Sequence, residues 1–202
     1  MPVVGDSVLC MATLQQVMDD QREFAIARDW GQFHSPKNLA MALGGELGEL
    51  ASAVTDALEF PGGRVEQLSS LESVTSEIAD VTLYLLRLFD VLGCALPERQ
   101  VKERHNDVAG DRERLILLTL ARLVGRVGAI LELWQWSAPE EIQTSSECVE
   151  HRIVAALDDL DCVAGLAGVE LAYVATAKLA SNAYRYPVGK SFGSRSKYTD
   201  FK

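Results

Sequence analysis

Apolar residues that recur every three or four positions in two long segments constrain the fold of this chain most strongly. In the first segment they are Leu39, Leu43, Leu47, Leu50, Val54 and Leu58, and in the second Val74, Ile78, Val81, Leu85, Leu88 and Leu92. This spacing places each set on one face of an α-helix. Proline and glycine cluster at residues 60–63, 96–97, 137–139 and 187–193, and no segment alternates as a strand does. The sequence therefore predicts an all-α fold.

An internal repeat predicts how the helices are organised. Residues 45–50 line up with residues 125–130, and residues 96–106 line up with residues 171–182. We expect two fused repeats, residues 1–107 and residues 108–202, the second of which starts late and ends in a basic tail rich in glycine and serine. Two helical hairpins of this kind pack as a four-helix-bundle-like core, here with pseudo-twofold symmetry.

Charge and composition exclude several classes of protein. The chain has 19 Lys and Arg against 29 Asp and Glu, a formal net charge of −10, which disfavours a nucleic-acid polymer as partner. The apolar runs are too short to span a membrane, and residues 1–14 lack the basic start of a secretory signal. The four cysteines form no Cys-x-x-Cys pair, as expected of thiols in a reducing compartment. We therefore expect a cytoplasmic protein without a disulfide framework or a zinc site.

Two pairs of acidic residues lie on the apolar segments. Glu46 and Glu49 share one helix face, as do Glu77 and Asp80, because the members of each pair are three residues apart. Glu77 falls inside its apolar stripe and the other three fall at the edge of theirs. An ionised carboxylate is costly to bury unless a cation or hydrogen bonds compensate it. The four acids therefore predict an oxygen-rich Mg²⁺ site, the alternative being two solvated helix faces.

Longer motifs resemble a known superfamily. They are Phe-Ala-x-x-Arg-Asp-Trp-x-Gln-Phe-His-x-Pro-Lys-Asn-Leu at residues 24–39, Gly-Glu-x-Gly-Glu-Leu at residues 45–50 and Glu-x-x-Asp-Val-x-x-Tyr-Leu at residues 77–85. In these motifs the chain resembles the all-α NTP pyrophosphatase superfamily, and within it the MazG-like dCTP pyrophosphatases. The match covers about residues 14–106, and the tail around residues 178–199 resembles the ending of the same family.

The resemblance implies a Mg²⁺-dependent hydrolase that cleaves a nucleoside triphosphate between its α and β phosphates, giving a monophosphate and pyrophosphate. It implies Glu46, Glu49, Glu77 and Asp80 as metal ligands, with Glu49 or Glu77 accepting a proton from the attacking water. The residues implied to contact the substrate are Trp30, His34, Lys37, Asn38, Tyr84, Lys102, Asn106, Trp136, Lys178, Asn182 and Tyr186.

Several of these residues also fit structural roles. Trp30 fits a core aromatic, His34 a loop or capping residue and Asn38 a helix N-cap. The chain also departs from the family, in which Gly-Glu-x-Gly-Glu-Leu leads to a Phe-Gln-Trp whose tryptophan borders the base. Here residues 54–56 are Val-Thr-Asp, so that wall is missing and Asp56 puts a preference for cytosine in question.

The second repeat holds what the first lacks. It has Trp134-Gln135-Trp136 in the corresponding register, but Arg126 and Ala129 replace its metal positions, and the aspartates at 158, 159 and 161 do not restore Glu-x-x-Asp. We predict one composite site per chain, in which the first repeat binds metal and the second supplies the base wall and the tail. The alternative is that both tryptophans are core or interface aromatics. Because the family builds sites between protomers, a homodimer is left open.

Three functions follow from these patterns. The first is a nucleotide pyrophosphohydrolase acting on dCTP or a related pyrimidine, which removes unwanted nucleotides or regulates their pool. The second is a hydrolase selective for dUTP or for damaged purine triphosphates. The third is a nucleotide-sensing or structural protein with vestigial hydrolysis, which the four intact acids of the first repeat disfavour.

Overall fold

The computed structural model describes residues 12–60, 62–97, 112–136 and 147–201, and these residues form helices and connecting turns. The helices are α1 (Leu14–Ala27), η1 (Trp30–Gln32), α2 (Pro36–Glu59), η2 (Val65–Ser70), α3 (Glu72–Val91), α4 (Arg112–Leu131), η3 (Glu132–Trp134), α5 (Glu147–Ala167), α6 (Leu171–Arg185), α7 (Val188–Ser191) and η4 (Tyr198–Asp200). No strand occurs in the described ranges, which confirms the predicted all-α fold.

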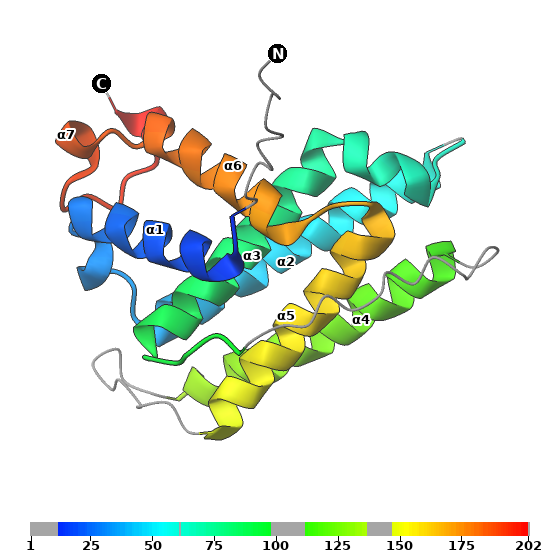
Figure 1. Cartoon of the computed structure of the whole chain (residues 1–202), viewed down its shortest axis with the longest axis horizontal. Helices are drawn as coiled ribbons and strands as arrows, with labels where there is room; N and C mark the ends of the chain where they lie inside the picture. Colours follow the sequence, from blue (N-terminus) through cyan, green and yellow to red (C-terminus); the bar gives the residue numbers. More distant parts are fainter. Residues whose placement is uncertain (1–11, 61, 98–111, 137–146, 202) are drawn as a thin grey trace, which may run out of the picture.

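Four long helices form the core as two hairpins. Helix α2 packs along α3 and α4 packs along α5, while α2 also contacts α4 and α3 contacts α5 (Figure 1). The predicted four-helix core is therefore confirmed. The predicted pseudo-twofold symmetry remains a prediction, and the expected boundary between the repeats at residues 107 and 108 lies outside the described residues.

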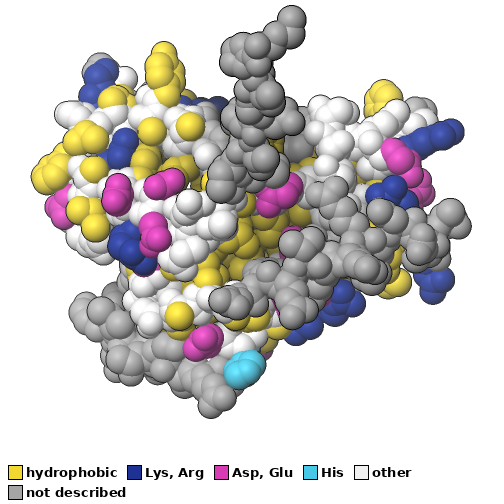
Figure 2. All heavy atoms as spheres, viewed as in Figure 1, with side chains coloured by type: hydrophobic (Ala, Val, Ile, Leu, Met, Phe, Trp, Pro, Cys, Tyr) yellow, Lys and Arg dark blue, Asp and Glu magenta, His cyan; other side chains and the backbone are white. Residues whose placement is uncertain are grey.

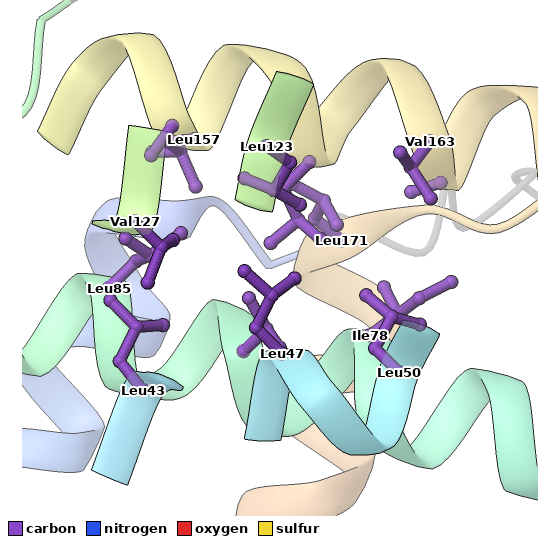
Figure 3. Packing of buried hydrophobic residues seen from close by; sticks show 14 of the residues in the cluster. Leu43, Leu47, Leu50, Ile78, Leu85, Leu123, Val127, Leu157, Val163 and Leu171 are labelled. Atoms are coloured by element: carbon purple, nitrogen blue, oxygen red, sulfur yellow. The ribbon is translucent and has the colours of Figure 1, made fainter. Parts of the chain in front are cut away.

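The apolar stripes of the sequence are the contact surfaces of this core. Leu43, Leu47 and Leu50 of α2 and Ile78 and Leu85 of α3 are buried against residues of α4, α5 and α6, and Figure 3 shows these side chains converging from several helices. Residues of both repeats belong to one continuous apolar cluster. Burying a leucine or isoleucine contributes roughly 1.5–3 kcal/mol, so the stripes account for most of the driving force for packing.

Helices α1 and α6 form a second layer that creates the site. Both pack on α3 and also contact each other, and Figure 1 places α7 and the C-terminal residues beside α1. Helix α1 begins with a capping box, in which the Thr13 hydroxyl accepts from the Gln16 backbone N–H and the Gln16 side chain accepts from the Thr13 N–H. Because α6 contacts α1, the end of the second repeat lies against the start of the first.

Three further observations concern possible membrane spans, the cysteines and the surface charge. Of the described helices, none alone has the length and apolar character of a membrane span, although the bent pair Val149–Ala167 and Leu171–Arg185, which meets at 94°, passes that test jointly. Cys94 and Cys162 are half-buried and form no disulfide among the described residues. On the face drawn in Figure 2, acidic and basic side chains of the described residues are interspersed.

Candidate active site

Three carboxylates converge where α2 and α3 pack together. Glu46 comes from α2, and Glu77 and Asp80 come from α3; each offers one oxygen that lies within 4.8 Å of the oxygens of the other two. All three side chains are half-buried. One oxygen of Glu77, Oε2, is fully buried and has no hydrogen-bond partner among the described residues. A buried acceptor without a partner is unfavourable, so this cluster is arranged for a ligand that supplies positive charge.

The pKa values of these carboxylates also indicate that the cluster binds a positively charged ligand. Burial, followed by the charges of Asp80, Glu49 and Glu77, raises the pKa of Glu46 to about 7. Burial also raises the pKa of Glu77 and of Asp80, the latter although the bonded Lys178 acts in the opposite direction. Carboxylates that repel one another and are partly desolvated retain protons unless a cation joins them. Oxygen donors in this arrangement fit a hard divalent cation such as Mg²⁺.

Glu49 lies at the outer side of the cluster. Its side chain is exposed and, with Glu77, borders a hollow of about 870 Å³ on the surface of α2. Its charge raises the pKa of Glu46, Glu77 and Asp80, which shows that it is close enough to act on them. The structure therefore brings three of the four predicted ligands together and leaves the fourth beside them.

The raised pKa of Glu46 predicts a pH effect on the metal-free protein. Folded Glu46 retains its proton up to a pH of about 7, whereas its ordinary pKa is 4.5, so the free energy of unfolding should fall as pH rises through that window. We expect a loss of roughly 1–3 kcal/mol, discounted for partial exposure. Melting curves in chelator at pH 5 and pH 8 test this. Glu46→Gln should flatten the dependence, and an unchanged profile in that variant would contradict the assignment.

A cavity of about 440 Å³ opens beside the carboxylates. It is lined by residues of α1, η1, α2, α3, α6 and the tail. The predicted site residues that line it are Trp30, His34, Glu46, Asp80, Tyr84, Lys178, Asn182 and Tyr186. The predicted contacts Lys102 and Asn106 lie outside the described residues.

Basic residues of the second repeat line the same cavity as the acids Glu46 and Asp80 of the first. The Lys178 ammonium bonds to the Asp80 carboxylate and donates to Ser76 Oγ at 2.6 Å. Arg185, Arg195 and Lys197 also line the cavity. A cavity lined by both carboxylates and cations suits a metal-bound polyphosphate, since both charges of such a ligand find partners.

The motif at residues 24–39 anchors the tail over the cavity. The Trp30 indole N–H donates to the backbone carbonyls of Ser191 at 3.1 Å and Ser194 at 3.0 Å. Arg28 Nε donates to the Tyr186 carbonyl at 2.7 Å. The Trp30 ring also meets Tyr186 edge-on, with centroids 5.2 Å apart. Trp30 thus lines the cavity with its ring while its polar atom is committed to the tail.

Asp29 explains another part of the same motif. Its φ of 55° lies in the left-handed region, which few residues other than glycine, asparagine and aspartate adopt readily. Its carboxylate accepts from Gln32 Nε2 at 2.7 Å, which stabilises the turn between α1 and η1. Asp29 and Gln32 therefore shape the loop that presents Trp30.

Three of the predicted substrate contacts do not line this cavity. Lys37 borders a separate hollow of about 300 Å³ near Trp134. The Asn38 side chain donates to the Phe33 carbonyl at 3.0 Å, and its backbone N–H donates to Ser35 Oγ, so that Ser35 is the N-cap of α2.

Trp136 is the third, and its role as a base wall remains a prediction. Its side chain is 88% exposed, and it is not part of the cavity lining. The physical reason is that η3 buries Trp134 instead, which is 2% exposed in the core. Within one chain, the second repeat contributes α6 and the tail to the cavity but does not contribute Trp136.

The two tryptophans make a matched pair for a stability measurement. Trp134→Ala should reduce the free energy of unfolding by about 3–5 kcal/mol, because it empties a large buried volume. Trp136→Ala should change it by no more than about 0.5 kcal/mol, because this ring contacts mostly solvent. Urea denaturation of both variants checks the contrast, and equal losses would contradict the described packing.

Sequence reasoning missed how the second repeat neutralises the buried Asp159. Asp159 is buried and bonds to Arg126, which occupies the position of Glu46, and to Arg122 Nε at 2.9 Å. The two guanidinium groups supply the positive charge that a metal supplies in a cluster of acids. Arg126 at a metal position was the available signal for this replacement.

Among the cavity residues that were also missed are Gln21 on α1 and Arg87 on α3. Arg87 is a buried charge within an otherwise apolar stretch of α3, flanked by Leu86 and Leu88. Such a residue is unusual enough in the sequence to have marked the site. Gln21 lies on a half-polar helix face and gave no such signal.

An all-α core in which two adjacent helices contribute a carboxylate cluster is consistent with the all-α NTP pyrophosphatase fold. Comparison with known proteins gives 42% identity over 79 residues with dCTP pyrophosphatase 1 of Rattus norvegicus, covering 38% of this chain and 45% of that protein. Identity with the Mus musculus protein of the same name is 35% over 92 residues, covering 45% and 54%. For Homo sapiens it is 40% over 79 residues, covering 38% and 45%.

These matches confirm the similarity to the dCTP pyrophosphatases that the motifs predicted. The chain spans about half the length of the curated relatives it matches. No family profile matches the chain. No solved structure matches it.

Proposed function

We propose that this protein hydrolyses dCTP to dCMP and pyrophosphate with Mg²⁺ as its cofactor. The observation that carries the proposal is the convergence of Glu46, Glu77 and Asp80 beside a cavity that is also lined by the cations Lys178, Arg185, Arg195 and Lys197. The similarity to proteins named dCTP pyrophosphatase 1 supports the choice of substrate.

The carboxylates of Glu46, Glu77 and Asp80 would hold the cation, with Glu49 completing the acidic surface beside them. When bound, Mg²⁺ neutralises phosphate charge and lowers the pKa of water. Oε2 of Glu77 is buried without a hydrogen-bond partner in the described part of the chain, so contact with a cation would remove an unfavourable unpaired acceptor.

The cationic side of the cavity holds the polyphosphate. Lys178, Arg185, Arg195 and Lys197 lie along α6 and the tail, so the end of the chain supplies cations to a protein whose net charge is −10. Guanidinium groups bind phosphate through paired N–H donors. These residues orient the substrate so that its α-phosphorus faces the acids.

Water attacks the α-phosphorus, a new P–O bond forms, and the bond to the oxygen that bridges the α and β phosphates breaks. A carboxylate of Glu49 or Glu77 accepts the proton that the water loses. Burial and the charge of Glu46 raise the pKa of Tyr84 to about 12, so this phenol stays protonated and can donate a hydrogen bond to the ligand.

Pyrophosphate release from a panel of triphosphates tests the function. The panel holds dCTP, dUTP, dTTP, dATP, dGTP and 8-oxo-dGTP, each assayed with millimolar Mg²⁺ and with chelator. We expect release from dCTP that depends on Mg²⁺. Release from dUTP or 8-oxo-dGTP alone would favour the second hypothesis, and no release from any triphosphate would favour a protein that only binds nucleotides.

A further inference from the structure

Three polar side chains that the proposed reaction does not use, Gln21, His34 and Arg87, also line the cavity. Asp80, Tyr84 and Arg87 line the cavity from successive turns of α3. The seven-residue separation between Asp80 and Arg87 corresponds to about 10 Å along the helix. Gln21 and His34 line the cavity as well. A nucleobase whose phosphates lie at the acids would therefore reach the part of the cavity near Arg87.

Arg87 fixes the hydrogen-bonding state of His34. Arg87 Nε donates to His34 Nδ1 at 3.0 Å, so Nδ1 has no proton and Nε2 must carry one in the neutral ring. Burial and the nearby charge of Arg87 lower the pKa of His34 to about 4, which keeps the ring neutral at physiological pH. His34 is thus a hydrogen-bond donor at Nε2 and cannot exchange roles while Arg87 stays in place.

Arg87 is itself held by a buried ion pair. It bonds to the carboxylate of Asp90, which also bonds to Arg22 of α1. The side chains of Arg87 and Asp90 are both almost fully buried. A guanidinium held in this way cannot rotate away from His34 without leaving a buried carboxylate partly unpaired.

Gln21 offers a hydrogen-bond acceptor, whereas His34 offers a donor. Its Nε2 donates to the Leu83 carbonyl at 3.1 Å, and because that carbonyl can only accept, the orientation of the amide is determined. Its Oε1 is buried and has no hydrogen-bond partner among the described residues. Leaving such an acceptor unpaired costs about 1–3 kcal/mol, so a ligand that donates to it gains affinity.

We propose that Gln21 and His34 select the base by reading a donor beside an acceptor, with Arg87 as the positioning residue. The amino group of cytosine can donate to Gln21 Oε1, while its neighbouring ring nitrogen accepts from His34 Nε2. Uracil, thymine and guanine present an oxo group and a ring N–H in these places, so each contact becomes two acceptors or two donors. Adenine shares the amino pattern, and the size of the cavity must decide between it and cytosine.

This inference deepens the proposed function, so its test avoids hydrolysis. Binding of dCMP, dUMP, dAMP and dGMP is measured by calorimetry in chelator, with no bond cleaved. We expect dCMP to bind about 10- to 100-fold more tightly than dUMP, because unpaired polar groups in a built site reject the analogue. Equal affinities, or no binding of any monophosphate at millimolar concentration, would overturn the inference. Selectivity without pyrophosphate release would leave the base site in place and remove only the proposed reaction.

Gln21→Leu isolates the acceptor. It should lower the affinity for dCMP about tenfold or more and leave the affinity for dUMP unchanged or slightly higher. The ratio of the two affinities should therefore approach one. Gln15→Leu is the matched control, since Gln15 lies on the same helix, is exposed and does not line the cavity. A ratio in Gln21→Leu that equals the ratio in Gln15→Leu would contradict the role of Gln21.

The positioning role of Arg87 has a readout independent of both affinity and folding yield. In the intact protein, ¹⁵N NMR should show the His34 ring protonated at Nε2 and unprotonated at Nδ1 at pH 7. In Arg87→Met the ring should lose this single tautomer, and the dCMP to dUMP ratio should fall. A wild-type ring protonated at Nδ1 would overturn the assignment even if Arg87→Met does not fold.

Discussion

Glu77→Gln should reduce kcat for dCTP by about 10²–10³-fold while the protein stays folded and helical. Glu77 combines a buried free oxygen with a position in the carboxylate group, so the amide removes charge where a cation is needed. KM should change less than kcat, since the loss falls on the transition state. Glu46→Gln and Asp80→Asn should behave in the same way.

The melting temperature in chelator separates this effect from unfolding. Each neutral variant should melt at the same temperature as wild type or higher, because repulsion among the carboxylates is relieved. Wild type should gain stability from millimolar Mg²⁺ and the variants should gain less. Glu59→Gln, at the exposed end of α2, is the control and should keep full activity. Full activity in two of the three cluster variants would refute the metal site.

Asp90→Asn should cost about 3–5 kcal/mol of unfolding free energy, the largest loss we expect from a single polar substitution. The Asp90 side chain is 7% exposed and bonds to Arg87, which is 8% exposed, as well as to Arg22. Removing its charge leaves the buried Arg87 guanidinium without its counter-charge, which is far more costly than losing an exposed pair.

Asp19→Asn provides the comparison, because Asp19 also pairs with Arg22. That pair lies at 43% and 49% side-chain exposure, so its removal should cost less than about 1 kcal/mol. Urea denaturation of both variants measures the difference. Losses of equal size would show that the pair of Arg87 and Asp90 is not desolvated as described.

The fold was predictable because its determinants are local. The stripes from Leu39 to Leu58 and from Val74 to Leu92 each specify one helix face, and the turns between them carry proline and glycine. The acidic cluster was predictable for the same reason, since Glu77 is an acid inside an apolar stripe. Both inferences need only the helical period.

The rest of the site depends on contacts between distant segments. Lys178 meets Asp80 across 98 positions of sequence, and Trp30 meets Ser194 across 164. Spacing along one helix says nothing about such pairs. The different positions of the two tryptophans have the same origin, because the register of the repeat could not show that Trp134 would enter the core and Trp136 would remain in solvent.

The most direct test of the central claim is the position of bond cleavage. Hydrolysis of dCTP in ¹⁸O-labelled water with Mg²⁺, followed by ³¹P NMR of the products, shows which phosphorus water attacks. Attack at the α-phosphorus places the label in dCMP and leaves pyrophosphate unlabelled, which is the result we expect, and Glu77→Gln should produce almost none of either. Label in pyrophosphate, or the release of labelled inorganic phosphate with dCDP, would contradict the account.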